Sequence, residues 1–329
     1  MRRRSFLGLM AMSALGLVAC GNNSGGGAVV SGPSRTIQDL WGKDIIVPEN
    51  PQRIISLSEP TIDSLAALGM TPVGAVAGRG QSDLAPYIKS YFPNVPLMGV
   101  VSQPNFEAIG AAKPDLILVD GTSVNNNQPV LDALAQIAPT VYTGNAGGDW
   151  KQNFRIVANA VNKVEAGEQV IADYDARAAS LAAELAPDYG DSTFSIVRWQ
   201  GTSAALILKE LPAGRALTDL GLKRPATQDR DGRGHSDPVS NENLKDIDAD
   251  YIFFGTLGGS SVSNPNAGGT VDEAAAQQAL EVAESVPGFT DLTAYKNGKI
   301  LPVDGSVWTS TGGPKLMDRI LSDIENLLL

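Results

Sequence analysis

The sequence predicts an α/β protein with two Rossmann-like lobes, parallel-rich sheets and a single long connecting helix. In the first half, short apolar runs such as residues 53–57 and 115–119 alternate with helical stretches. A second series of the same kind begins at Phe194. Between the two series, residues 149–186 contain little turn chemistry apart from Gly167. Apolar strands that alternate with helices indicate a parallel sheet covered on both faces.

The elements of the first lobe follow from local signals. The expected strands cover residues 53–57, 72–76 and 115–119, and the expected helices cover 61–68 and 106–112. Gly69 ends the first helix and Pro114 follows the second, because glycine and proline interrupt regular structure. We assign residues 35–164 to this lobe.

The middle of the chain has apolar residues at helical spacing, which predicts two helices that meet near Gly167. The second helix, residues 165–186, is expected to end at Pro187. At 1.5 Å per residue it would be about 33 Å long, enough to connect two lobes.

The second lobe is assigned to residues 187–329. Its expected strands and helices alternate along the chain, with a polar loop at 225–240. The strands are 194–199, 205–208, 250–255 and 299–303, and the helices are 213–220, 241–247, 272–285 and 313–329.

The N-terminus has the pattern of an export signal. Three arginines, Arg2 to Arg4, precede a short apolar stretch at residues 6–18, and Cys20 follows a small residue. The run Leu17-Val18-Ala19-Cys20 resembles a bacterial lipobox, which implies that residues 1–19 are removed and that Cys20 carries a lipid. Residues 20–34 then form a flexible tether. The start also fits the twin-arginine pattern, so the export route stays open between the two systems.

Charge and cysteine content exclude several classes of function. The net charge is −11, and it becomes −14 without Arg2, Arg3 and Arg4. Such an acidic protein is not expected to bind nucleic acid, or a membrane other than through the Cys20 lipid. Cys20 is the only cysteine, so the core, without disulfides, must stabilise the mature chain.

Several phrases in a fixed order resemble the substrate-binding lipoproteins of ABC importers for iron-siderophores, haem and cobalamin. They are Pro51-Gln52-Arg53-Ile54-Ile55-Ser56-Leu57, Leu65-Ala66-Ala67-Leu68-Gly69, Pro104-Asn105-Phe106-Glu107-Ala108-Ile109, Lys113-Pro114-Asp115-Leu116-Ile117-Leu118, Leu220-Gly221-Leu222-Lys223-Arg224-Pro225, Ser240-Asn241-Glu242-Asn243-Leu244 and Tyr295-Lys296-Asn297-Gly298-Lys299. The stretch 137–150 is most similar to the ferric-siderophore members. The resemblance implies that the protein captures a ferric siderophore in a cleft between two lobes and delivers it to an ABC permease dimer. It implies no enzymatic activity and no cofactor.

The resemblance also implies partner-binding residues. Glu107 and Glu242 match glutamates that dock on arginines of the permease, one from each lobe. Charge complementarity of this kind sets orientation and encounter rate. The alternative is that both are solvated carboxylates near helix N-termini, where the helix dipole favours negative charge.

We expect the protein to be a monomer on the outer face of the cytoplasmic membrane.

Ligand contacts are expected from loops at the carboxyl ends of strands. The candidates are Arg79, Arg198, Trp199, Arg233, His235 and Trp308, with Arg230 as a weaker choice because Asp229 and Asp231 flank it. Guanidinium groups hold anionic chelator oxygens, and the tryptophans would provide flat apolar walls. Surface ion pairs and core packing are the alternatives for these two residue types.

His235 is the only histidine. It could complete an iron coordination sphere, ligate haem, or be a solvated loop residue. A bare zinc or manganese site would use several histidines, so no metal site is expected. Haem or cobalamin capture, or a cell-envelope interaction protein without transport function, are the alternative functions. A hydrolase is disfavoured because the sequence contains neither a Gly-x-Ser-x-Gly elbow nor a His-Glu-x-x-His pair.

Overall fold

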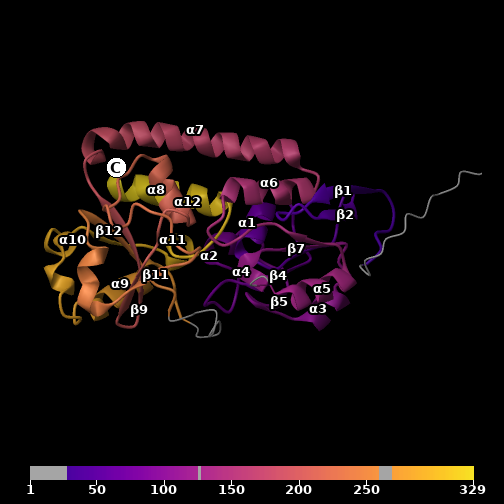
Figure 1. Cartoon of the computed structure of the whole chain (residues 1–329), viewed down its shortest axis with the longest axis horizontal. Helices are drawn as coiled ribbons and strands as arrows, with labels where there is room; N and C mark the ends of the chain where they lie inside the picture. The colour runs from indigo at the N-terminus through magenta and orange to yellow at the C-terminus, as the bar shows by residue number, and fades with distance from the viewer. Residues whose placement is uncertain (1–27, 125–126, 259–268) are drawn as a thin grey trace, which may run out of the picture.

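Two α/β lobes lie side by side beneath one long helix, α7 (Val164–Tyr189), in the computed structural model (Figure 1). The structure describes residues 28–124, 127–258 and 269–329. The signal peptide and Cys20 lie outside the described residues. The predicted fold class of two lobes with parallel-rich sheets is confirmed.

The first lobe is built on a six-stranded sheet in the order β6-β5-β4-β3-β7-β8. All neighbouring pairs are parallel except β5 with β6. The strands are β3 (Ile54–Ser56), β4 (Gly74–Ala77), β5 (Leu97–Val100), β6 (Gln103–Pro104), β7 (Leu116–Val119) and β8 (Thr140–Tyr142). The helices are α1 (Glu59–Ala67), α2 (Pro86–Lys89), α3 (Phe106–Ala111), α4 (Gly121–Val124), α5 (Gln128–Ile137) and α6 (Trp150–Ala160).

Both faces of this sheet are buried, as the continuous apolar runs predict. In β7, Leu116 and Leu118 pack into one cluster, and Ile117 and Val119 pack into the cluster on the opposite face. An additional hairpin, β1 (Ser34–Gln38) and β2 (Asp44–Pro48), joins this lobe. Arg35 of the hairpin donates to Asn159 Oδ1 of α6 at 3.1 Å, which fixes the hairpin on that helix.

The second lobe has a five-stranded sheet in the order β11-β10-β9-β12-β13. Strands β9, β12 and β13 are parallel, and β10 and β11 continue the sheet in antiparallel fashion. The strands are β9 (Phe194–Gln200), β10 (Ser203–Leu206), β11 (Asp237–Val239), β12 (Tyr251–Gly255) and β13 (Ile300–Pro302). The helices are α8 (Pro212–Asp219), η1 (Asn241–Ile247), α9 (Glu273–Ala283), η2 (Phe289–Asp291), α10 (Thr293–Lys296), α11 (Gly305–Trp308) and α12 (Pro314–Leu328), where η1 and η2 are 3₁₀ helices.

The connecting helix is longer than predicted, because it begins at Val164 and passes Pro187 to end at Tyr189. A proline lacks a backbone donor and its ring crowds the carbonyl four residues earlier, which strains a helix but need not end it. The next bond that closes the helix, from Gly190 N–H to Ala186 O, is present at 3.1 Å. The Tyr189 hydroxyl donates to the Leu328 carbonyl at 2.6 Å, so contacts with α12 hold the last turn.

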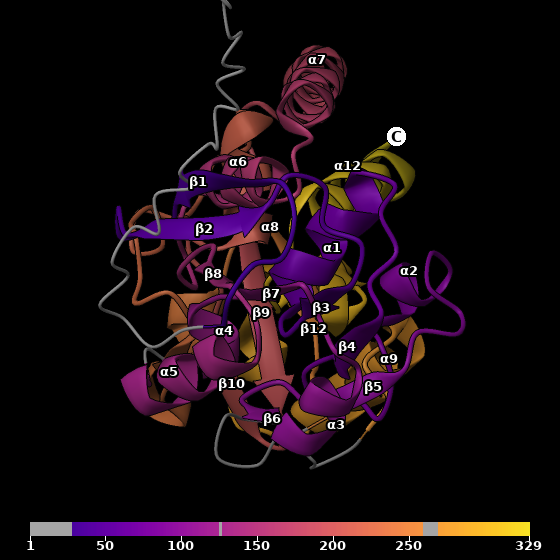
Figure 2. The same cartoon turned by 90° about the vertical axis from the view of Figure 1, so that its right-hand side faces the viewer.

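A second connection joins the lobes beside the cleft. Asp63 of α1 accepts hydrogen bonds from the backbone N–H groups of Lys315 (2.8 Å) and Leu316 (2.9 Å), which start α12 in the other lobe. Such N–H groups have no partner inside their own helix, so Asp63 caps α12 across the lobes. Figure 2 looks onto the first lobe and shows α1 next to α12, with α7 on the opposite side of the molecule from α3.

In the described part of the chain, none of the helices combines the length and the apolar character that crossing a membrane requires.

Candidate functional site

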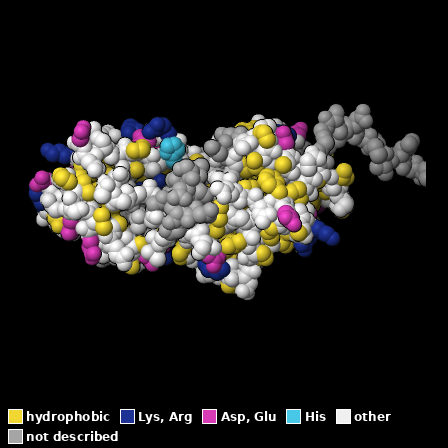
Figure 3. Space-filling view, turned by 90° about the horizontal axis from the view of Figure 1, so that it is seen from below, with side chains coloured by type: hydrophobic (Ala, Val, Ile, Leu, Met, Phe, Trp, Pro, Cys, Tyr) yellow, Lys and Arg dark blue, Asp and Glu magenta, His cyan; other side chains and the backbone are white. Residues whose placement is uncertain are grey.

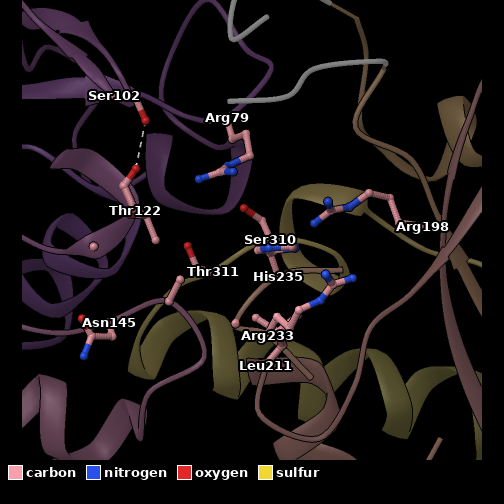
Figure 4. A pocket seen from close by; sticks show the side chains of 13 residues that line it. Arg79, Ser102, Thr122, Asn145, Arg198, Leu211, Arg233, His235, Ser310 and Thr311 are labelled. Atoms are coloured by element: carbon pink, nitrogen blue, oxygen red, sulfur yellow. Dashed lines mark hydrogen bonds between the residues drawn. The ribbon is translucent and has the colours of Figure 1, made fainter. Parts of the chain in front are cut away.

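A cavity of about 390 Å³ lies between the two lobes. Its size falls within the range of roughly 300–1,000 Å³ that is typical of small-molecule sites. The first lobe lines it with Arg79, Ser102, Gly121, Thr122, Asn145 and Ala146, and the second with Arg198, Leu211, Arg233, Gly234, His235, Ser310 and Thr311 (Figure 4). Figure 3 shows the face on which the histidine side chain, in cyan, reaches the surface where the lobes meet.

The cavity lies at the carboxyl ends of the parallel strands. Strands β4 and β7 end just before Arg79 and Thr122, and β9 carries Arg198 near its end. In the first lobe the chain turns from one direction across the sheet to the other between β3 and β7. Open α/β sheets bind their ligands at such a switch point.

A buried carboxylate holds the loop that carries Arg79. Glu59 begins α1, is 5% exposed, and accepts a hydrogen bond from the Arg79 backbone N–H at 2.9 Å through Oε1. The same oxygen accepts from the Ser310 hydroxyl at 3.3 Å, across the lobes. Burial raises the pKa of Glu59, while the charge of Arg79 opposes that rise. Its Oε2 has no hydrogen-bond partner among the described residues.

Arg198 is held more firmly than the other arginines of the cavity. Its guanidinium donates to Ser236 Oγ at 2.9 Å and to the Thr309 carbonyl. Burial, with a smaller contribution from the charge of Arg79, lowers the pKa of Arg198 to about 10. Because this value lies well above neutrality, Arg198 remains a cation at neutral pH.

The loop between Arg230 and β11 contributes two exposed side chains. The Arg233 side chain is 71% exposed, and its Nε lies 3.7 Å from Asp237 Oδ1. His235 is exposed, with Nδ1 3.1 Å from the carbonyl of Ser236. Arg230 lies outside the cavity and forms an ion pair with Asp237 at 2.9 Å.

Four of the predicted ligand residues, Arg79, Arg198, Arg233 and His235, therefore line one cavity. Within the described chain, the Arg79 guanidinium has no hydrogen-bond or ion-pair partner, so it is available to a ligand. The lining contains three guanidinium groups. The two nearby carboxylates, Glu59 and Asp237, are not part of the lining. The cavity is thus suited to an anion.

The two tryptophans require a correction. Trp199 and Trp308 are both 0% exposed, so neither forms a wall of the cavity. Consecutive strand residues point to opposite faces, so Trp199 must face away from the side to which Arg198 points. It packs against Phe289, with ring centroids 5.3 Å apart. Trp308 stacks on Phe253 at 4.1 Å and donates to Asp323 at 3.0 Å.

Several cavity residues were not predicted. Ser102, Thr122 and Ser310 lie in loops that were expected at the strand ends, but their short polar side chains gave no separate signal. Asn145 lies beyond those loops, and its Oδ1 accepts from the Tyr142 hydroxyl at 2.9 Å. Glu59 was also missed, although its position just after strand β3 could have indicated that it lies near the ligand-binding loops.

The described residues contain no group of three or more histidine, cysteine, aspartate or glutamate side chains that could hold a metal ion. A metal that enters this cavity would therefore need other ligands, such as those of a chelator.

The predicted docking glutamates lie one in each lobe. Glu107 is exposed in the first turn of α3, and Glu242 is exposed in the first turn of η1. The Asn105 side chain caps α3 by accepting from the Ala108 N–H at 3.0 Å. Both carboxylates are accessible to a partner, and their docking role stays a prediction.

Comparison with known proteins agrees with the fold. Residues 54–306 match a family described as periplasmic binding protein. A probable siderophore-binding lipoprotein, YfiY of Bacillus subtilis, is 34% identical, covering 98% of this chain and 97% of the relative. The Fe(3+)-citrate-binding protein YfmC of the same organism is 28% identical, with coverage of 92% and 89%.

Among solved structures, SirA of Staphylococcus aureus in complex with staphyloferrin B is similar, with a TM-score of 0.73 and 25% identity. The match covers 89% of this chain and 97% of the SirA chain.

Proposed function

The chain belongs to the periplasmic binding protein family, and from this premise we propose that it captures an anionic ferric siderophore between its lobes for an ABC importer. The single observation that carries the choice of ligand is the convergence of Arg79, Arg198 and Arg233 on one cavity. Two relatives are named for binding a siderophore or ferric citrate, and these names support the same ligand class.

The mechanism is binding and handover. Guanidinium groups hold carboxylate or catecholate oxygens through paired N–H donors and keep their charge at any physiological pH. The iron arrives inside its chelator, and the protein recognises the outer oxygens of that chelator. Ser102, Thr122 and Ser310 add neutral hydrogen-bonding groups that orient the complex.

Delivery requires a permease, and Glu107 and Glu242 are the proposed contacts with it. One exposed carboxylate on each lobe matches a dimeric partner that offers one cationic pocket on each half. Such charge pairs set the orientation of docking. We propose that the protein docks as a monomer.

We also propose that Cys20 carries the lipid that holds the protein on the outer face of the cytoplasmic membrane. The pattern Leu17-Val18-Ala19-Cys20 supports this location. Replacing Cys20 with serine is expected to release the protein from membranes and to abolish incorporation of a labelled fatty acid. Unchanged membrane retention of the variant would contradict the anchor.

The test of the function is a titration of tryptophan fluorescence with ferric citrate, a ferric catecholate, a ferric hydroxamate, haem and cobalamin. We expect submicromolar binding of an anionic ferric complex, lost in Arg198→Ala. Binding of none of the five ligands would contradict the transport function. Tight binding of haem alone would make haem the ligand, although the buried Trp308 cannot provide a flat apolar wall for a porphyrin.

A further inference from the structure

One buried side chain holds the backbone of the loop that carries Arg233 and His235. Glu210, which is 6% exposed, precedes α8. Its Oε2 accepts a hydrogen bond from the Gly232 N–H at 2.7 Å, and its Oε1 accepts from the Gly234 N–H at 3.2 Å. Hydrogen bonds to an ionised carboxylate are stronger than those between neutral groups. The loop has no helix or strand between residues 231 and 236, so these two bonds define its path.

The glycines of the loop are required by this arrangement. A Cβ atom at Gly232 would lie 2.7 Å from Glu210 Oε1, which is closer than real contacts allow. Gly234 has a φ of +82°, and its Cβ would lie 2.4 Å from the Ala146 carbonyl oxygen. A side chain at Gly234 would therefore require a shift of the backbone, whereas one at Gly232 would displace the Glu210 carboxylate.

The loop is also pressed against the other lobe. A Cβ at Gly147 would lie 2.5 Å from Gly234 Cα and 2.8 Å from Glu210 Cγ. Arg215 of α8 fixes the same point, because its guanidinium donates to the carbonyl of Glu210 at 3.0 Å and to that of Gly147 at 3.3 Å. The backbone of the loop therefore lies between the Glu210 carboxylate and residues 146–147.

We propose that Glu210 is a positioning residue: it sets Arg233 and His235 at the mouth of the cavity without touching the ligand itself. This inference rests on the proposed function and names the residue that shapes one side of its site. Arg233 and His235 flank Gly234, so fixing the Gly234 N–H fixes the direction in which both side chains leave the backbone. Figure 4 shows Arg233 and His235 beside Leu211, the residue that follows Glu210.

The side chains themselves are weakly held, which is why the backbone clamp matters. Arg233 has only the 3.7 Å contact with Asp237 among the described residues, and His235 contacts the carbonyl of its own neighbour. Exposed ion pairs of this kind contribute little to holding a side chain. Without the two bonds to Glu210, the loop would sample other paths and the two side chains would leave the cavity.

The binding test uses the full chain, ferric citrate as the probe and a double-mutant cycle. Glu210→Gln keeps the volume and one acceptor oxygen, and we expect it to weaken binding about tenfold, as for the loss of one charge-assisted bond. In an Arg233→Ala/His235→Ala background the same change is expected to weaken binding less than about twofold, because the residues through which it acts are gone. Glu184→Gln, an exposed change on α7, is the matched control and should leave the affinity unaltered.

A second readout does not depend on any ligand. His235 is the only histidine, so its ring gives one isolated set of nuclear magnetic resonance signals in the full chain. We expect Glu210→Gln to move these signals and to speed hydrogen exchange at the Gly232 and Gly234 amides. If Glu210→Gln does not fold, Gly232→Ala tests the same contact, because its Cβ would displace the carboxylate.

The outcomes separate the two proposals. Equal losses of affinity in both backgrounds, or His235 signals that do not change, would overturn the role of Glu210. Failure of the unaltered protein to bind any of the five ligands would instead contradict the proposed function, while the His235 signals would still decide whether Glu210 positions the loop.

Discussion

The two lobes contribute unequally to the cavity between them. The first lobe provides one guanidinium, Arg79, together with the neutral side chains of Ser102, Thr122 and Asn145. The second provides Arg198, Arg233 and His235, together with the neutral side chains of Ser310 and Thr311. If the proposed function holds, the second lobe contributes more of the attraction for an anionic ligand, and both lobes contribute neutral hydrogen-bonding groups. The two lobes therefore differ in the positive charge that they bring to the cavity and not in whether they offer neutral hydrogen-bonding groups.

The buried carboxylates next to the cavity have the opposite distribution. Glu59, Asp63 and Asp120 of the first lobe are all 5% exposed or less, and burial raises the pKa of each. In the second lobe, burial also raises the pKa of Asp304. Among the carboxylates next to the cavity, those of the first lobe should therefore contribute most to the pH dependence of folding.

The largest expected effect tests that distribution. The pKa of Asp120 is raised from 3.8 to about 6, so its stabilising contribution is complete below pH 3.8 and is lost as the pH rises through about 6. Asp120→Asn keeps the Oδ1 acceptor for Thr122 and Ser123. We expect it to increase the free energy of unfolding at pH 7.5 by at most about 3 kcal/mol.

Urea unfolding at pH 4 and at pH 7.5 measures this effect, and the variant should differ from the unaltered chain only at the higher pH. The matched variant in the second lobe is Asp304→Asn, whose carboxylate accepts from Ser306 in the same geometry. A larger gain from Asp304→Asn than from Asp120→Asn would contradict the assignment to the first lobe.

The next effect compares the arginines of the two lobes. Because Arg198 is half-buried and fixed by Ser236 and Thr309, it should lose little conformational freedom on binding. We expect Arg198→Ala to weaken ferric citrate binding about 100-fold and Arg79→Ala about tenfold, within the range for charged hydrogen bonds. Isothermal titration calorimetry gives both values. A larger loss from Arg79→Ala would place the main attraction in the first lobe.

A smaller effect is expected at the permease, where the lobes should contribute equally. Glu107→Ala and Glu242→Ala are each expected to slow iron uptake by cells about threefold, and the double variant about tenfold, as for exposed ion pairs. Ligand affinity measured on the purified variants should not change. Uptake at the normal rate in the double variant would exclude these carboxylates as docking contacts.

The smallest effect concerns a contact outside the cavity. Trp41 stacks on Tyr142 at 3.8 Å, and the Tyr142 hydroxyl donates to Asn145. Because Trp41 acts through two intermediate residues, Trp41→Ala should weaken binding less than about twofold, with Trp41→Phe unchanged. A tenfold loss of affinity in a fluorescence titration would show that the first lobe's side of the cleft depends on the hairpin.

Much of the fold could be predicted because the strands are buried on both faces. Residues 115–119 are apolar at nearly every position, and such runs are typical of parallel sheets. The end of α7 could not be predicted from Pro187, because contacts of Tyr189 with α12 stabilise the turn beyond it.

The candidate site was predicted in part. Arg79 and Arg198 follow from their places at strand ends, whereas the prediction for Trp199 is wrong because adjacent residues of a strand point to opposite faces of the sheet. Glu210 gave no signal, since its role depends on the path of a loop more than twenty residues later in the chain. Local patterns do not encode such contacts.

The contact between Gly147 and Gly234 joins the lobes through main-chain atoms alone. The side chains that flank it, Asn145, Arg233 and His235, take no part in this contact. Changes at these three positions should therefore leave this contact intact, whereas Arg79 and Arg198 would also have to change before the cavity suited a cationic chelate. Part of the ligand specificity thus lies at positions that do not hold the lobes together, while Ser310, which lines the cavity and bonds to Glu59 across the lobes, serves both roles.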